Sequence, residues 1–189
     1  MEAVKKTIVR KNKEEGVYSN NLLTRKVHVP FQNVGQNLKQ LLENKMKKDI
    51  EGKCSVEGFI KPDSTKITSY SSGLVEANNI VFDVVFECLV CCPVEGQKIK
   101  CVIKNITQAG IRAVINSEIS PIVVYLSRDH HYNNEYFIKL SEDEEITIRV
   151  IGQRYELNDS QVSVIGEFVK PKLDKYIKKG GKKPKLVIN

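Results

Sequence analysis

Alternation of apolar and polar residues with a period of two dominates this chain, and it is typical of β-strands that bury one face. The longest such run covers residues 79–92, where Asp83 and Glu87 fall on one face. The other face is apolar and consists of Ile80, Phe82, Val84, Phe86, Cys88 and Val90. Pro93 ends the run because proline cannot donate a hydrogen bond to a neighbouring strand. This run is the clearest strand prediction in the chain.

Before this strand, the pattern predicts shorter strands and one helix. A strand at 22–31 ends at Pro30, and Asn33 can then cap a helix that Gly52 ends. The helix has one apolar stripe at helical spacing, made of Val34, Leu38, Leu41, Leu42 and Met46. Two further short strands are expected at 53–60 (with Cys54, Val56 and Ile60 on one side) and at 65–70.

The second half of the chain predicts only strands and turns. Its five short strands lie at 97–106, 110–116, 121–127, 144–153 and 161–169. Five strands in this order are typical of an OB-type barrel, with the polar and aromatic segment 128–143 inserted between the third and the fourth. The predicted fold class is therefore α+β, an antiparallel sheet with one helix followed by an all-β barrel.

The first predicted barrel strand carries different chemistry on its two faces. Gly96 and Gly110 bracket it, and its inner face consists of Ile99, Cys101 and Ile103. Its outer face carries Lys98, Lys100 and Lys104. Outward lysines on a one-sided strand suit a small barrel whose wall meets a polyanion. The pattern favours nucleic-acid binding over catalysis, and the alternative is an ordinary solvated strand face.

Composition limits the class of protein further. The chain has 189 residues, 41% of them hydrophobic, which suits one domain or two small ones with a real core. No apolar run has the length of a membrane span or of a secretory signal, so we expect a soluble, intracellular protein with no membrane partner. The net charge of +7 lies entirely in residues 170–189, so the rest of the chain is neutral. Any binding of RNA by the body must then depend on how its charges are arranged.

The five cysteines predict buried, reduced thiols in a reducing compartment. Cys88 and Cys91 form one Cys-x-x-Cys, but no second ligand pair follows, and the adjacent His130 and His131 are expected at the surface. No metal and no cofactor is predicted. An enzyme with a thiol nucleophile is disfavoured, because no cysteine lies in a turn beside an evident base.

Several short motifs occur in the order and spacing of one protein family. In the first half they are residues 34–42, 51–54, 58–60 and 72–73, followed by a hinge at 93–96. In the second half they are residues 109–111, 126–128, 143–146, 150–154 and 164–166. Over roughly residues 22–169 the chain thereby resembles the stalk subunit of multisubunit RNA polymerases, a family that includes the seventh subunit of RNA polymerase II and its archaeal and viral relatives.

The resemblance implies a domain organisation and a function. It implies a flexible arm at 1–20, a tip domain at 21–93 that docks on the polymerase core, an OB-fold domain of the S-one RNA-binding type at 94–169, and a disordered basic tail at 170–189. The implied function is that of a non-catalytic stalk subunit that anchors near the clamp, supports transcription initiation and contacts nascent RNA. The implied partners are the largest polymerase subunits, a fourth-subunit-like stalk partner and nascent single-stranded RNA.

The arm and the tail have no counterpart in the usual family pattern, so we expect a divergent member, with a large DNA virus as one source. The expected location is the nucleus, or the cytoplasm or virion for a viral protein.

The resemblance and the strand register together give candidate site residues. In this barrel type RNA crosses the face formed mainly by the second and third strands, where stacking and phosphate contacts share the work. The predicted RNA-binding residues are Lys98, Lys100, Lys104, Arg112, Tyr125, Arg128 and His130. The predicted polymerase-core interface is Gly58, Phe59, Ile60, Lys61 and Pro62, as a flat apolar wedge. Burial of Phe59 and Ile60 in an internal core is the alternative.

A second function fits the same barrel. A free-standing RNA-binding protein, acting in translation or RNA decay, would share the OB-fold but would have no use for a docking domain before it.

Overall fold

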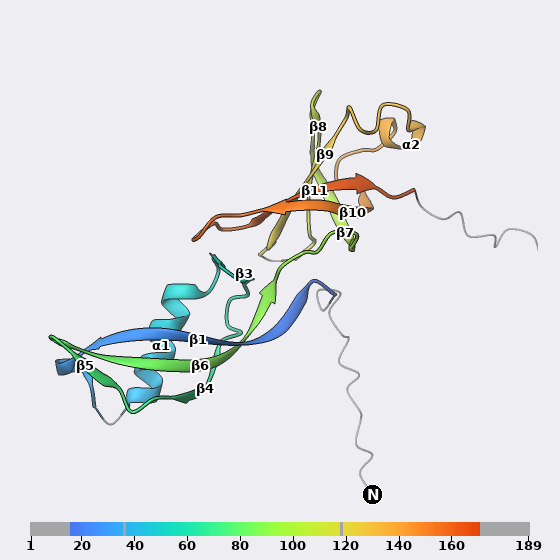
Figure 1. The fold of residues 1–189 in the computed structure, drawn as a ribbon. Coiled ribbons are helices and arrows are strands. Elements are labelled where there is room, and N and C mark those ends of the chain that lie inside the picture. Colours follow the sequence, from blue (N-terminus) through green and yellow to red (C-terminus); the bar gives the residue numbers. More distant parts are fainter. Residues whose placement is uncertain (1–15, 36, 118, 171–189) are drawn as a thin grey trace, which may run out of the picture.

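The structure is a computed structural model that describes residues 16–35, 37–117 and 119–170. It consists of an antiparallel sheet and a closed β-barrel, which lie side by side and are joined by the end of one long strand (Figure 1). In the described part of the chain, no helix has both the length and the apolar character needed to cross a membrane. The arm before Gly16 and the tail after Lys170 lie outside the described residues.

The sheet is organised around β6 (Asn79–Cys91), the long strand predicted from its alternating faces. Along one side β6 pairs with β1 (Tyr18–Pro30) over the whole length of both strands. Along its other side it pairs with three short strands, namely β3 (Gly58–Ile60), β4 (Lys66–Tyr70) and β5 (Leu74–Glu76). β1 begins at Tyr18, so the last three residues of the predicted arm are strand.

One helix, α1 (Leu38–Ile50), covers one face of this sheet (Figure 1). It buries Leu42 and Met46 against side chains of the strands, which include Val27, Val29, Ile67, Phe82, Val84 and Phe86. The predicted start after Asn33 is wrong, because Phe31–Asn33 forms a short 3-10 helix and Val34 is extended. Lys47 and Lys48 lie in the last turn of the helix, where cations suit its dipole.

The barrel contains the five strands predicted for it, each shifted at its ends by at most two residues. They are β7 (Lys98–Ile106), β8 (Gly110–Val114), β9 (Ile122–Ser127), β10 (Glu145–Arg154) and β11 (Val162–Phe168). Their order around the barrel is β7-β8-β9-β11-β10, with β10 closing onto β7. β9 and β11 are parallel and the other pairs are antiparallel. This closed five-stranded barrel is consistent with an OB-fold.

The turn between β7 and β8 requires glycine at position 110. A Cβ atom there would lie 2.1 Å from the carbonyl oxygen of Leu126 on β9, far inside contact distance. Any other residue would push these neighbouring strands apart. Gly110 therefore keeps β8 and β9 paired at the end of the barrel wall.

The predicted strand at 53–60 is instead a tight hairpin, and it joins the sheet to the barrel. β2 (Cys54–Ser55) pairs with β3, and Val56 at the turn is 70% exposed rather than inward. Cys54, Phe59 and Cys91 belong to the same buried cluster as the barrel interior, and Phe59 is fully buried. The sheet and the barrel therefore share this cluster, whereas the face of the sheet that α1 covers has a second core of its own.

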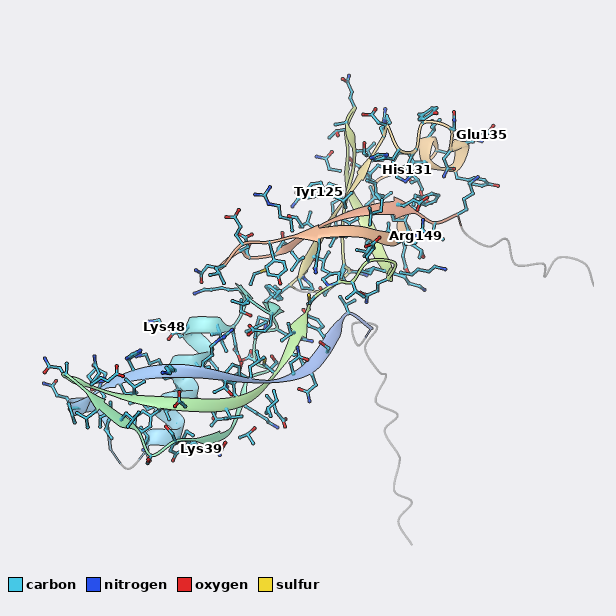
Figure 2. All side chains as sticks on the ribbon, viewed as in Figure 1. Lys39, Lys48, Tyr125, His131, Glu135 and Arg149 are labelled. Atoms are coloured by element: carbon cyan, nitrogen blue, oxygen red, sulfur yellow. The ribbon has the colours of Figure 1, made fainter. Side chains whose placement is uncertain are left out.

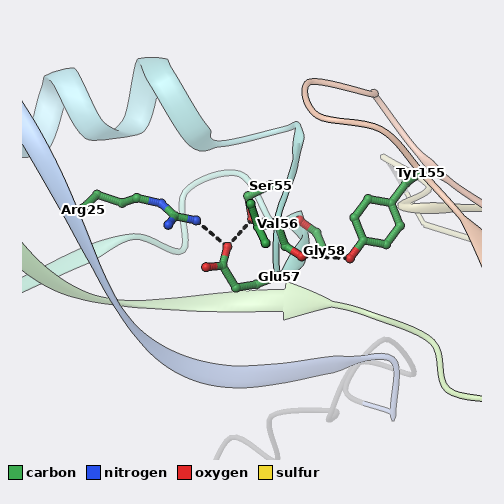
Figure 3. A network of polar contacts seen from close by, with 6 residues as sticks. All are labelled: Arg25, Ser55, Val56, Glu57, Gly58 and Tyr155. Carbon is green, nitrogen blue, oxygen red and sulfur yellow. Dashed lines mark hydrogen bonds and ion pairs between the residues drawn. The ribbon is translucent and has the colours of Figure 1, made fainter.

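Hydrogen bonds hold the hairpin to the loop between β10 and β11. The Cys54 N–H donates to the Asp159 carbonyl over 2.8 Å, and the Asn158 N–H donates back to the Cys54 carbonyl over 2.9 Å. Figure 3 shows the Tyr155 hydroxyl reaching from the barrel to the Val56 carbonyl, at 3.1 Å. On the hairpin's other side, Glu57 accepts from Arg25 and from the Ser55 hydroxyl.

Replacing Phe59 with alanine should destabilise the whole chain, because it leaves a cavity in the core that the sheet and barrel share. We expect Phe59→Ala to lower the free energy of unfolding by about 3 to 5 kcal/mol, measured by urea denaturation. Val56→Ala, in the same hairpin but exposed, should change it by less than about 0.5 kcal/mol. Equal effects of the two substitutions would contradict the shared core.

Candidate nucleic-acid interface

Arg112 and Tyr125 form the centre of the candidate interface on the β8–β9 wall. They lie directly opposite each other in the antiparallel register, so both side chains leave the same outer face of the barrel. Both are exposed, and Tyr125 is flanked on β11 by Ile165, which is also exposed. A tyrosine ring, an arginine guanidinium and an apolar side chain together offer stacking and phosphate contacts for a single strand.

Arg128 extends this wall past the end of β9. Its N–H donates to the Ala109 carbonyl over 3.0 Å, which ties it to the turn between β7 and β8. Within the described residues, neither Arg112 nor Arg128 has a carboxylate within ion-pair distance. Their charges are thus not offset by a direct ion pair within that part of the chain.

The three lysines of β7 are exposed, but two of them face acidic side chains along the β7–β10 seam. Lys100 Nζ lies 3.9 Å from a carboxylate oxygen of Glu145, and Lys104 Nζ lies 2.9 Å from one of Asp143. Lys98 has no such partner among the described residues. Two of the three lysines predicted to bind RNA are therefore engaged in exposed ion pairs.

His130 is exposed, whereas the surface position expected for His131 is wrong. His131 is buried, and its Nδ1 lies 2.6 Å from the Ser127 carbonyl while its Nε2 lies 2.9 Å from the Phe168 amide nitrogen. Since a carbonyl can only accept and an amide can only donate, the ring is neutral and carries its proton on Nδ1. His131 also stacks on Phe137 with a centroid distance of 4.4 Å.

These contacts fasten the insertion between β9 and β10 onto the barrel. The insertion contains a one-turn helix, α2 (Glu135–Ile138), which the sequence analysis did not predict. The sequence does contain a signal for this helix, namely the run Tyr136-Phe137-Ile138. Phe137 in this run is the apolar residue that α2 buries. The insertion is therefore a fixed part of the candidate interface.

The predicted core-interface residues do not form an exposed apolar wedge. Phe59 and Ile60 are 0% and 1% exposed, because the hairpin is inserted between the sheet and the barrel. Gly58 is buried as well, and a Cβ there would lie 2.6 Å from the Cys91 carbonyl oxygen. Lys61 and Pro62 are half-buried, with Lys61 Nζ 5.1 Å from the centre of the Tyr18 ring.

The thiols offer little nucleophilic or metal-binding chemistry at neutral pH. All five cysteines are free, and only Cys92 is partly exposed. Burial, aided by the carboxylate of Asp159, raises the pKa of Cys54 to about 11, and burial also raises the pKa of Cys91 to about 12. The described residues contain no cluster of three His, Cys, Asp or Glu side chains that could hold a metal ion.

Comparisons with known proteins confirm the resemblance that the motifs indicated. The chain is 25% identical over 142 residues to "DNA-directed RNA polymerase II subunit RPB7" of Glycine max, covering 66% of this chain and 78% of that protein. Subunit 7 of RNA polymerase II from Arabidopsis thaliana is 25% identical over 139 residues, covering 65% and 76%.

A viral relative aligns over almost the whole chain. A protein of Acanthamoeba polyphaga mimivirus, provisionally named as DNA-directed RNA polymerase subunit L376, is 21% identical over an alignment 193 positions long, covering 93% of this chain and 94% of that protein. No protein-family model matches the chain.

Alkylation should separate Cys92 from the other thiols. Burial raises the pKa of Cys88 to about 11 and that of Cys101 to about 12, so at pH 8 about 0.1% or less of these thiols is ionised, and only the thiolate reacts. We expect iodoacetamide to label Cys92 first in the native protein, as read by peptide mass spectrometry, and the buried four only after denaturation. Native labelling of Cys54 at the rate of Cys92 would contradict this burial.

Loss of the His131 ring should destabilise the protein, because the buried Phe168 N–H and the part-buried Ser127 carbonyl lose their partner. We expect His131→Ala to cost about 2 to 4 kcal/mol of unfolding free energy. His130→Ala provides the matched control, since its exposed ring should contribute less than about 0.5 kcal/mol. Urea denaturation of the two variants measures the difference, and a similar cost for both would refute the role given to His131.

Proposed function

We propose that this chain, a homologue of subunit 7 of RNA polymerase II, is a non-catalytic subunit of a DNA-dependent RNA polymerase. In this role the sheet half anchors the protein on the polymerase core near the clamp, and the barrel projects toward the departing transcript. The subunit supports initiation and contacts nascent RNA. Its location follows that of its polymerase, in the nucleus, or in the cytoplasm or virion for a viral enzyme.

The observation that carries this proposal is the extent of the similarity to relatives named as polymerase subunits. The mimivirus protein aligns with 93% of this chain, so the similarity spans both the sheet and the barrel. The buried contact of Phe59 with the barrel interior adds support, because an anchor must be rigidly joined to whatever it positions. A fourth-subunit-like partner along the side of the two halves remains part of the proposal.

We assign docking on the largest polymerase subunits to the end of the sheet that lies farthest from the barrel. Leu74 and Val75 on β5 are 68% and 67% exposed there, and Phe31, whose N–H contacts the Asn78 carbonyl, is 46% exposed. Figure 1 shows β5 at the far end of the sheet. Exposed apolar side chains grouped in this way are typical of partner surfaces. Lys61 and Pro62, which lie nearer the barrel, are a secondary contact in this proposal.

The barrel's part of the proposal rests on the β8–β9 wall. Arg112, Tyr125 and Arg128 are exposed and clear of direct ion pairs in the described chain, so they are available to a passing single strand. Phosphate contacts of this kind are salt-sensitive and independent of sequence, which suits a surface that every transcript must pass.

The shared core limits how the alternative function, a free-standing RNA-binding protein, can be tested. If the barrel acted alone, removal of the first half of the chain should leave it intact. Removal would instead expose the barrel-interior side chains that Phe59, Cys54 and Cys91 now cover. Truncation is therefore a poor test of the alternative, and point substitutions on the surface are needed.

Affinity purification of the tagged chain from its own cells tests the proposal directly. We expect the largest polymerase subunits to copurify, and we expect the double substitution Leu74→Asp, Val75→Asp to reduce their recovery at least tenfold, because charge is costly to bury at an interface. Leu157→Asp is the matched control, since Leu157 is equally exposed (65%) but lies in the loop between β10 and β11. Recovery of the wild-type chain without large polymerase subunits would refute the proposed function.

A further inference from the structure

A second cationic site lies at the end of the barrel, where the insertion after β9 faces β10 and β11. An open cleft of about 700 Å³ separates the insertion after β9 from Arg149 of β10 and from the end of β11. Its side chains include Lys98, His130, Tyr132, Arg149, Glu167 and Lys170. Figure 2 shows Arg149 and His131 at this same end of the barrel.

Register places the charges of the cleft in a row across three strands. Lys98 of β7 lies opposite Arg149 of β10, and Arg149 lies opposite Glu167 of β11. Glu167 accepts from Nε and Nη2 of Arg149 with a single carboxylate oxygen. A guanidinium has five N–H donors, so this contact orients Arg149 and leaves other donors for a ligand. With Lys98 and Lys170, the lining carries a net positive charge.

An exposed aromatic ring stands beside these cations. Tyr132 is 70% exposed, although it directly follows the buried His131. Because His131 is bonded at both ring nitrogens and stacked on Phe137, the backbone that carries Tyr132 is fixed to the barrel. The backbone at Tyr132 is therefore already ordered, so binding costs little backbone freedom there.

We infer that this cleft is a second binding site for single-stranded RNA, in which Lys98 and Arg149 contact phosphates and Tyr132 stacks on a base. The inference deepens the proposed contact with nascent RNA and rests on it. A cationic cleft beside an exposed ring is the combination that proteins use to hold single strands without reading their sequence. An ion-binding site alone would have no use for the ring.

The test measures binding of a short fluorescent single-stranded RNA to the full chain by anisotropy, over a series of salt concentrations. Lys98→Ala removes one phosphate contact, so the slope of log affinity against log salt should fall by about 0.7. Lys100→Ala is its matched control on the same strand, because Lys100 is exposed but does not line the cleft. It should leave the slope unchanged.

The aromatic half of the site is tested in the same assay. Tyr132→Ala should weaken binding about tenfold without changing the salt slope, because stacking carries no charge. Tyr132→Phe should restore the affinity. Tyr136→Ala is the control, since Tyr136 is 50% exposed in the same insertion but does not line the cleft. It should change the affinity by less than about twofold.

Each outcome bears on the inference separately from the proposed polymerase function. Equal effects of Lys98→Ala and Lys100→Ala on the salt slope would overturn the inference that the cleft binds RNA. Unchanged RNA affinity of Tyr132→Ala would overturn it as well. Loss of binding in Arg112→Ala and Tyr125→Ala, with the cleft variants normal, would overturn it and leave the β8–β9 wall as the RNA contact. If polyglutamate displaces the labelled RNA as well as unlabelled RNA does, the cleft binds anionic charge alone, and the inference of an RNA site is overturned. Copurification with polymerase is unaffected by all of these results.

Discussion

Burial of the β2–β3 hairpin between the sheet and the barrel is the contact on which the arrangement of this protein depends. Phe59 is fully buried there, and Cys54 exchanges two backbone hydrogen bonds with the loop between β10 and β11. An aromatic side chain in a core contributes several kcal/mol, which is a large share of the stability of a small protein. This burial fixes the two halves as one body, although the chain connects them only once, between β6 and β7. Whatever the sheet docks on, the barrel is held at a set position relative to it.

The same constraint explains which parts of the fold could be predicted from the sequence. Strict alternation identified β6 and all five barrel strands, because each buries one face continuously. It failed at residues 53–60, since a period of two cannot distinguish one strand from two short strands with a turn at Val56 and Glu57. Phe59 and Ile60 were predicted at an interface with another protein, and they lie instead at an interface within the chain.

The sequence allowed prediction of which side chains of the candidate site point outward, but not of which side chains they meet in the fold. Outward positions of Arg112 and Tyr125 followed from strand register, and the structure sets them opposite each other. The acidic partners of Lys100 and Lys104 come from the far side of a long connection, and no local pattern indicates them. His131 was missed for a similar reason, because its partners Ser127 and Phe168 are brought together only when β9 and β11 pair.

The distribution of charge on the barrel decides what kind of contact it can make. The chain up to residue 169 has no net charge, so long-range attraction of RNA to the body is weak and its local cations must act at short range. Lys100 and Lys104 are offset by neighbouring carboxylates, whereas Lys98, Arg112 and Arg128 are not offset by ion pairs in the described chain. A few separated cations with tyrosines beside them favour weak, salt-sensitive contacts over a tight site. For the RNA contact that we propose, such weak interactions would suit a strand that must keep moving, because each one can be released before the next forms.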